Sequence, residues 1–290
     1  MREWIAEAVK QAGGTVRIQE IQPVSGGEIN EAYRVSTSKA NYFVKINREM
    51  NGDFFKSEVD GLELLRSSET IAIPEVYHCG SVEGAAILVL EWIEGNSSDQ
   101  TAEKLGQGVA LLHQTHGKAF GLEEDNYLGT FWQPNGWHED WASFYRDSRL
   151  AVQVDLAERK GRLNTTRRKR LEQLLFRIEE WIPSEVEPSL LHGDLWGGNW
   201  LAGPKGEPYL IDPAVSYGHL ELELAFTELF GGFPSRFYEA YQEIQPLSRE
   251  YKERQELYQL YYLLVHLNAF GESYGGAVDR ILKKYVEARP

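Results

Sequence analysis

Two aspartates and an asparagine stand at spacings that could support phosphoryl transfer. The run HGDLWGGN contains Asp194 and Asn199, and Asp212 follows at the end of the apolar run Tyr209–Ile211. In such a pattern one carboxylate takes the proton of an attacking hydroxyl, while the amide and the second carboxylate hold the Mg²⁺ ions that bridge the phosphates of ATP. Mg²⁺ prefers these hard oxygen ligands. The pattern predicts Asp194 as the catalytic base and Asn199 and Asp212 as metal ligands. The alternative is a plain turn rich in Gly and Asp.

A lysine and a glutamate would have to position the phosphates. Lys45 lies in the β-like run Tyr42–Ile46, and Glu58 falls in the apolar stripe of a helix expected over Asp53–Arg66. A carboxylate on a buried face must find a partner or lose its charge. We therefore expect Lys45 and Glu58 to pair, although both could instead reach solvent as surface charges.

Two backbone segments could bind the rest of the nucleotide. Gly26 and Gly27 form a turn between two β-like runs, and glycines let backbone N–H groups approach phosphate oxygens closely. A simple hairpin turn is the alternative there. The apolar strand that ends in Glu91, Trp92 and Ile93 could offer backbone N–H and C=O groups to an adenine edge.

Residues close to the two aspartates are candidates for contact with the phosphate acceptor. Trp196 lies two residues after Asp194, where its ring could stack on a sugar or pack under the loop. His219 and Glu221 open a helix soon after Asp212, although a carboxylate at a helix start also has a structural use. The sequence predicts substrate contacts for these three side chains.

The short segment after Asp212 has two consequences. Pro213 restricts the residue before it to extended geometry, so we expect Asp212 to be extended and held in one orientation. A helix is expected to begin as early as Leu220, which leaves no room for a long segment with a phosphorylation site. This favours a constitutively active kinase for small molecules over a regulated kinase for proteins.

The elements that must position these residues divide the chain into two parts. An initial helix, three strands, a helix and two strands predict a small sheet-plus-helix lobe over residues 1–94. Residues 95–290 are expected to form a larger, mainly helical lobe, in which the octapeptide and the run 209–212 make a short hairpin. Helices are expected near 101–116, 138–160, 165–182, 220–230, 234–243 and 249–270, with another close to the C-terminus. The predicted fold class is α+β and bilobal, with a ligand cleft between the lobes.

The amino-acid composition favours a soluble globular protein over membrane, secreted and nucleic-acid-binding proteins. Hydrophobic residues make up 42% and charged residues 26% of the 290 residues, as in soluble globular proteins, and no apolar stretch approaches a membrane span. The N-terminus has no apolar core of signal-peptide type, and the single cysteine, Cys79, excludes an internal disulfide framework, so a cytoplasmic location is expected. The net charge of −14 argues against nucleic-acid binding. An acidic surface could attract a cationic substrate, and the alternative is that it only keeps the protein soluble.

The string LLHGDLWGGNW resembles the signature of the fructosamine kinase family, which are ketosamine kinases related to aminoglycoside phosphotransferases. Supporting stretches follow in the expected order over roughly residues 24–275: SGGEINEAYRV, YFVKIN, LVLEWIEG, FWQPNGW, LIDPAVSYGHLELELA and FGGFPSRFYEAYQ. The resemblance implies a bilobal kinase-like fold and ATP-dependent phosphorylation, with Mg²⁺, of the carbon-3 hydroxyl of a ketosamine. Fructosamines or ribulosamines on lysine or small amines would be the substrates, in repair or catabolism of glycated amines.

The resemblance assigns the same roles to the same residues, Asp194 as the base and Lys45 with Glu58 at the phosphates. A monomer or weak homodimer is expected. Many family members carry a cysteine at the position of Glu28. Because this chain has a glutamate there, redox control through that position is not expected.

The alternative enzyme is a related kinase for an aminoglycoside, choline or another small alcohol. A nucleotide-binding module without catalysis would be expected to lack the base or a metal ligand, and this chain has both.

Overall fold

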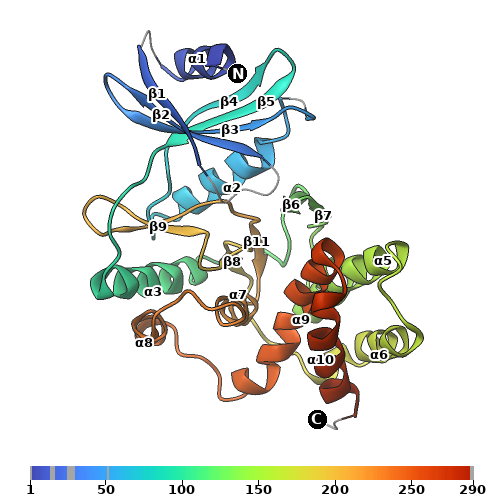
Figure 1. Ribbon diagram of the computed structural model, residues 1–290. Coiled ribbons are helices and arrows are strands. Elements are labelled where there is room, and N and C mark those ends of the chain that lie inside the picture. Colours follow the sequence, from blue (N-terminus) through green and yellow to red (C-terminus); the bar gives the residue numbers. More distant parts are fainter. Residues whose placement is uncertain (1, 14–16, 25–29, 51, 288–290) are drawn as a thin grey trace. The chain divides into compact units, whose positions relative to one another are not determined.

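The computed structural model describes residues 2–13, 17–24, 30–50 and 52–287 (Figure 1). The main chain divides into two compact units: unit 1 is Met1–Leu105 with Asn199–Pro213, and unit 2 is Gly106–Gly198 with Ala214–Pro290. These units differ from the lobes predicted at residues 1–94 and 95–290, because residues 95–105 and Asn199–Pro213 group with the N-terminal part of the chain in unit 1. The division into lobes stays a prediction.

A five-stranded antiparallel sheet forms the centre of unit 1. Its strand order is β1-β2-β3-β5-β4. The strands are β1 (Ile18–Pro23), β2 (Glu31–Thr37), β3 (Asn41–Asn47), β4 (Val76–Val82) and β5 (Ala85–Glu91). The predicted succession of three strands, a helix and two strands is confirmed.

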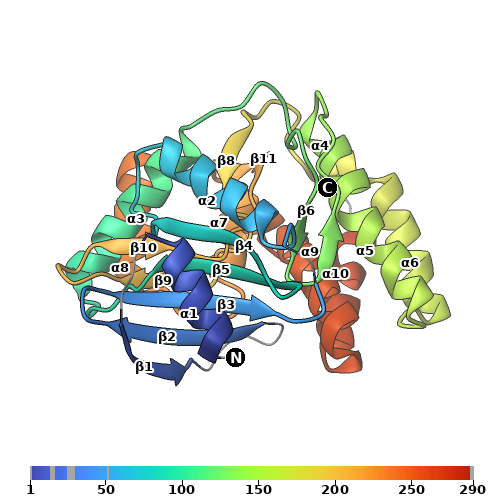
Figure 2. The same cartoon turned by 90° about the horizontal axis from the view of Figure 1, so that it is seen from above.

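Two helices cover opposite faces of this sheet, α1 (Arg2–Gln11) and α2 (Lys56–Ser67) (Figures 1 and 2). Val44 and Ile46 of β3 belong to the apolar core that α1 completes. Successive side chains of a strand point to opposite faces. Lys45, which lies between these two residues, therefore points toward the face that α2 covers.

A short ribbon brings a distant part of the chain into unit 1. Strands β9 (Trp200–Ala202) and β10 (Pro208–Leu210) pair in antiparallel fashion. The backbone N–H of Leu210 donates to the carbonyl oxygen of Ala72 at 3.1 Å, which fastens the ribbon to the segment before β4. Because of this attachment, Asn199 and Asp212 belong to the same compact unit as Lys45.

Unit 2 is mainly helical. Helix α3 (Asp99–His113) enters it from unit 1, and the further helices are α4 (Trp141–Ser143), α5 (Ala151–Arg159), α6 (Thr165–Phe176), α7 (Leu220–Thr227), α8 (Ser235–Ile244), α9 (Tyr251–Phe270) and α10 (Gly275–Glu287). Most of α9 is buried, and it packs against α5, α7 and α10. The helix expected over 138–160 is present as one continuous helical run from Trp141 to Arg159, in which a π-helical segment, Phe144–Leu150, joins α4 to α5. Such a segment departs from the 3.6-residue period on which the prediction depended.

Two further ribbons lie in unit 2, β6 (Asn126–Leu128) with β7 (Phe131–Gln133), and β8 (Ser189–Leu191) with β11 (Ser216–Gly218). The predicted hairpin of the octapeptide and the run 209–212 is present as the β9–β10 ribbon, with a hydrogen bond from Ile211 N–H to the Asn199 carbonyl oxygen at its end. A second ribbon that was not predicted, β8–β11, encloses it in sequence, so that β8–β11 is the outer ribbon and β9–β10 the inner ribbon. Across the described ranges, no helix combines the length and apolar character needed to cross a membrane.

Candidate active site

Lys45 joins two carboxylates in unit 1. Its Nζ donates to Oε1 of Glu58 at 2.8 Å and also donates to Oδ1 of Asp212. The side chains of Lys45 and Glu58 are only 9% and 16% exposed, so this pair is largely removed from water. The expected pairing of Lys45 with Glu58 is present, and the surface-charge alternative is wrong. Strand β3, helix α2 and the end of the inner ribbon thus meet at one ammonium group.

Burial and the two carboxylates act on the pKa of Lys45 in opposite directions. Burial by itself would lower the pKa of Lys45, but the negative charges of Asp212 and Glu58 outweigh burial and hold that pKa above its ordinary value. Burial raises the pKa of Glu58, the charge of Lys45 opposes this shift, and the charge of Asp212 adds to it. Lys45 therefore remains a cation over the physiological pH range, which suits a residue that meets phosphate groups.

Asp212 has a backbone conformation that the sequence did not predict. Its φ is +55°, in the left-handed region, so the expected extended geometry is wrong. Pro213 disfavours the right-handed helical region for the residue before it, but aspartate enters the left-handed region more readily than most residues. The bond to Lys45 and the hydrogen bond from Ile211 N–H to the Asn199 carbonyl oxygen support this conformation. Strained backbone of this kind costs roughly 1–3 kcal/mol and clusters at functional sites.

Asn199 and Asp212 flank the same end of the inner ribbon. Asn199 directly precedes β9, Asp212 closely follows β10, and the bond between Ile211 and Asn199 closes that end at 3.1 Å. One amide and one carboxylate suit Mg²⁺, which completes its coordination with water and substrate phosphates. Nowhere in the described part of the chain do three or more His, Cys, Asp or Glu side chains form a possible metal cage. One amide oxygen and one carboxylate at this end of the ribbon are chemically suited to a Mg²⁺ ion that takes its other ligands from water and phosphates, and the assignment of Asn199 and Asp212 as metal ligands stays a prediction.

The predicted catalytic loop, residues 192–198 around Asp194, lies in unit 2 and is held in shape by its own backbone contacts. The backbone N–H of Asp194 donates to Nδ1 of His192 at 3.3 Å, and the N–H of Trp196 donates to the carbonyl oxygen of Asp194 at 3.1 Å. Gly193 has a φ of +85°, and a Cβ placed on it would lie 2.0 Å from the carbonyl oxygen of Ala214. Only glycine fits this position without moving the main chain.

Glu223 is a site residue that the sequence reasoning missed. Its carboxylate is fully buried in α7 and accepts hydrogen bonds from the backbone N–H groups of Gly193 at 2.6 Å and His192 at 3.2 Å. His113 donates to the same carboxylate through Nε2 at 2.9 Å, and its Nδ1 pairs with the Tyr241 hydroxyl at 2.7 Å. Burial would raise the pKa of Glu223, but these hydrogen bonds and the neighbouring histidines hold it below its ordinary value. Glu223 is thus an ionised anchor for the catalytic loop.

A signal for this role was present in the sequence. Glu223 stands in the run LELELAFT, where both neighbours of each glutamate are leucines. Every residue from 221 to 227 is buried. A carboxylate in a helix that is apolar on all sides needs a buried partner, and the same argument that paired Glu58 with Lys45 applies here.

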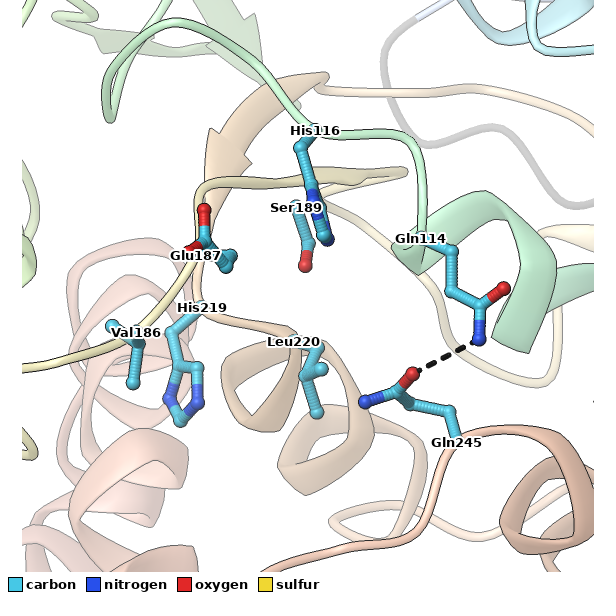
Figure 3. Close-up of a pocket in the computed structure, with 8 residues that line it drawn as sticks. All are labelled: Gln114, His116, Val186, Glu187, Ser189, His219, Leu220 and Gln245. Carbon is cyan, nitrogen blue, oxygen red and sulfur yellow. Dashed lines mark hydrogen bonds between the residues drawn. The ribbon is translucent and has the colours of Figure 1, made fainter.

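His219 lies away from the catalytic loop. In the outer ribbon Leu191 pairs with Ser216 at the loop end, whereas Ser189 pairs with Gly218 at the far end, directly before His219. Figure 3 shows His219 on the wall of a cavity of about 430 Å³ at that far end. Burial lowers the pKa of His219 to about 3, so the ring is neutral at physiological pH. Its predicted substrate contact stays a prediction, to which this placement gives no support.

Glu221 has a structural partner. It is 2% exposed, and it accepts two hydrogen bonds from Arg254 at 2.7 and 2.8 Å and a third from the Ser248 hydroxyl at 3.0 Å. This arrangement fastens the start of α7 to α9. The structure does not bring Glu221 together with Asp194, and its predicted substrate contact likewise remains unsupported.

Trp196 remains a candidate for contact with the substrate, and the end of strand β5 remains a candidate for contact with the adenine. The Trp196 side chain is 43% exposed, and its ring lies against Gly198 within the catalytic loop. The N–H of Glu91 is bonded to the carbonyl oxygen of Glu75 at 2.9 Å. Among the described residues, the main chain of Trp92 and Ile93 makes no such hydrogen bond, which leaves these groups able to meet a base edge. Gly26 and Gly27, with Glu28, lie outside the described residues.

Comparison with known proteins places these features in a family. The family model described as fructosamine kinase matches residues 1–288. A protein of Enterococcus faecium named a probable ketoamine kinase is 43% identical over 267 residues, which cover 92% of this chain and 95% of that protein. The chloroplastic protein-ribulosamine 3-kinase of Arabidopsis thaliana is 34% identical over 291 residues, which cover 99% of this chain and 87% of that protein.

Solved structures agree with this comparison. A crystal structure from Haemophilus somnus, provisionally assigned as a fructosamine-3-kinase, matches with a TM-score of 0.86 and 30% identity over 99% of this chain and 98% of that one. Choline kinase LicA of Streptococcus pneumoniae matches with a TM-score of 0.65 at 19% identity, over 98% of both chains, and shows the fold alone. The predicted α+β, protein-kinase-like fold class is confirmed, and the chain belongs to the fructosamine kinase family.

Proposed function

We propose that this protein is an ATP-dependent kinase that phosphorylates the carbon-3 hydroxyl of a ketosamine, such as a fructosamine or ribulosamine on lysine or a small amine. The observation that carries the proposal is the contact of Lys45 with both Glu58 and Asp212 in a member of the fructosamine kinase family. A buried cation between a helix carboxylate and a possible metal ligand is what phosphate positioning requires.

Each residue then has a distinct part in the reaction. Lys45, oriented by Glu58, binds the α- and β-phosphates. Asn199 and Asp212 would hold Mg²⁺, which would supply positive charge to neutralise the transferring phosphoryl group. The Asp194 carboxylate accepts the proton of the attacking hydroxyl. Glu223 holds the backbone of the Asp194 loop, so that the base does not have to be ordered during the reaction.

The substrate assignment has separate support. The Enterococcus relative is named for ketoamines and the Arabidopsis relative for protein-bound ribulosamines. An aminoglycoside phosphotransferase of the same fold, APH(4)-Ia, has been solved with AMP-PNP, which supports ATP as the phosphate donor. The net charge of −14 suits a cationic acceptor. We further propose a cytoplasmic protein, monomeric or weakly dimeric, that acts in repair or catabolism of glycated amines.

The test is Mg²⁺- and ATP-dependent phosphorylation of ribulosyl-lysine and fructosyl-lysine peptides, read by mass, with the Asp194→Ala variant as the control. The wild type is expected to add one phosphate, and the variant is expected to bind ATP but lose kcat by orders of magnitude. An unchanged kcat in the variant would exclude Asp194 as the base. If the wild type binds ATP but transfers nothing to either peptide, the ketosamine assignment is wrong and aminoglycosides, choline and other small alcohols become the acceptors to test.

A further inference from the structure

Four ring side chains in unit 2 form a cluster that no step of the proposed reaction uses. This aromatic cluster consists of Phe230, His266, Phe270 and Tyr274. The His266 ring lies at its centre, with centroid distances of 4.6 Å to Phe230, 5.6 Å to Phe270 and 5.0 Å to Tyr274. His266 donates through Nδ1 to the carbonyl oxygen of Tyr262 at 2.8 Å, and this bond fixes the orientation of the central ring.

The aromatic cluster is attached to the catalytic loop by main-chain and side-chain contacts. Gly232, just after Phe230, approaches the loop so closely that a Cβ on Gly197 would lie 3.0 Å from its Cα. Phe226 contacts the cluster and stacks on Tyr262, with ring centroids 3.6 Å apart and planes 5° from parallel. The Tyr262 hydroxyl donates to the carbonyl oxygen of Gly193 at 3.1 Å. The cluster and the loop of Asp194 are therefore neighbours in one compact unit.

The outer members of the cluster are open to solvent. Phe270 is 53% and Phe230 is 43% exposed. The rings within the cluster meet at angles of 40° or more, so none of its members covers another ring face to face. Exposed, contiguous aromatic surface is unfavourable in water and commonly marks a binding site.

We propose that the aromatic cluster binds the amine-bearing side of the acceptor, that is, its protonated secondary amine and the adjoining alkyl chain. The inference rests on the proposed function and names the part of the substrate that these rings recognise. The faces of aromatic rings attract ammonium groups and pack well against methylene chains. In a ketosamine the amine lies only a few bonds from carbon 3, so the surface that binds it must adjoin the catalytic loop, as this cluster does. A free sugar has no such cation.

The test compares a charged with an uncharged acceptor. Phe230→Leu and Phe270→Leu each keep an apolar side chain but remove a π-face. Phe176→Leu is the matched control, because Phe176 is an exposed phenylalanine at the end of α6, outside the cluster. KM and kcat are measured with a fructosyl-lysine peptide and with the same peptide acylated on the sugar-bearing nitrogen, which removes its charge.

The cluster variants are expected to raise KM for the charged peptide by about 2- to 30-fold, the range of a single cation–π contact. KM for the acylated peptide, KM for ATP and all constants of Phe176→Leu should not change. An equal rise for both peptides, or no rise for either, would overturn the assignment of the cluster while the kinase activity itself stands. A wild type that phosphorylates no ketosamine would instead overturn the proposed function, and this inference with it.

Discussion

The buried carboxylate of Glu223 accepts a hydrogen bond of 2.6 Å from the backbone N–H of Gly193, the residue directly before the proposed base. The catalytic loop is thereby attached to helix α7. Since the same carboxylate also bonds His113, the position of the loop depends on two helices of unit 2.

Glu223→Gln is expected to lower kcat by about 10- to 100-fold with little change in KM for ATP, because hydrogen bonds to a charged group contribute about 1.5–3 kcal/mol. Steady-state kinetics measure this. Glu221→Gln is the matched control, since Glu221 lies in the same helix but bonds Arg254 rather than the loop. It should lower stability and leave kcat nearly unchanged. Equal kcat values for wild type and Glu223→Gln would contradict the anchoring role.

The lowered pKa of Glu223 predicts how stability depends on pH. A carboxyl group whose pKa is lower in the folded than in the unfolded state stabilises the protein fully above its ordinary pKa of 4.5. That stabilisation is lost as the pH falls through the lowered value. The Tm of the wild type should therefore fall more steeply below about pH 4.5 than the Tm of Glu223→Gln. Parallel curves from thermal scans at a series of pH values would show that Glu223 is not the group responsible.

Lys45→Met leaves Glu58 and Asp212 without their shared cation. The pKa of Glu58, already raised, should rise further, and a carboxyl group whose pKa is raised by folding costs stability as the pH rises from 4.5 through the raised value. The loss of stability should be about 2–3 kcal/mol at pH 8 and smaller at pH 5. Lys56→Met removes an exposed lysine paired with Asp60 and is expected to show little loss at either pH. A deficit independent of pH would contradict the assignment.

The Asp212→Asn variant tests the role of Asp212 as a metal ligand without disturbing the backbone conformation at that position. Asparagine enters the left-handed region as readily as aspartate, so the backbone at φ +55° should be kept and Tm should change little. Loss of the carboxylate should weaken the response of activity to Mg²⁺ and lower kcat by about 100-fold or more. A Mg²⁺ titration of the activity measures this. If the variant titrates like the wild type, Asp212 is not the metal ligand.

Gly193→Ala should damage the loop. The added Cβ would meet the Ala214 carbonyl oxygen at 2.0 Å in a conformation that alanine avoids, so both kcat and Tm should fall markedly. Gly276→Ala is the control, because a Cβ there meets nothing within 4 Å and helix α10 should gain roughly 0.5–1 kcal/mol. Should Gly193→Ala keep wild-type kcat, the loop would be more adaptable than its main-chain contacts indicate.

Local sequence patterns were sufficient to predict much of the secondary structure of this protein. Apolar alternation and helical periodicity predicted the five strands and most helices, because each depends on neighbours within a few turns of chain. The pairing of Lys45 with Glu58 was predictable for a related reason: a carboxylate in an apolar stripe demands a cation, and the lysine on the facing strand supplies it.

The sequence by itself determined which chemistry-bearing residues this chain contains and in what order, and the motif that contains Asp194 and Asn199 was enough to indicate the family. Only the tertiary structure decided which contacts fix the positions of these residues. The left-handed backbone of Asp212, the separation of His219 from the catalytic loop and the anchoring of that loop by Glu223 all depend on contacts between distant segments. Local propensity at Asp212 even favoured the opposite conformation, because the restriction from Pro213 acts on one residue, whereas the bond to Lys45 comes from a strand far away in the sequence.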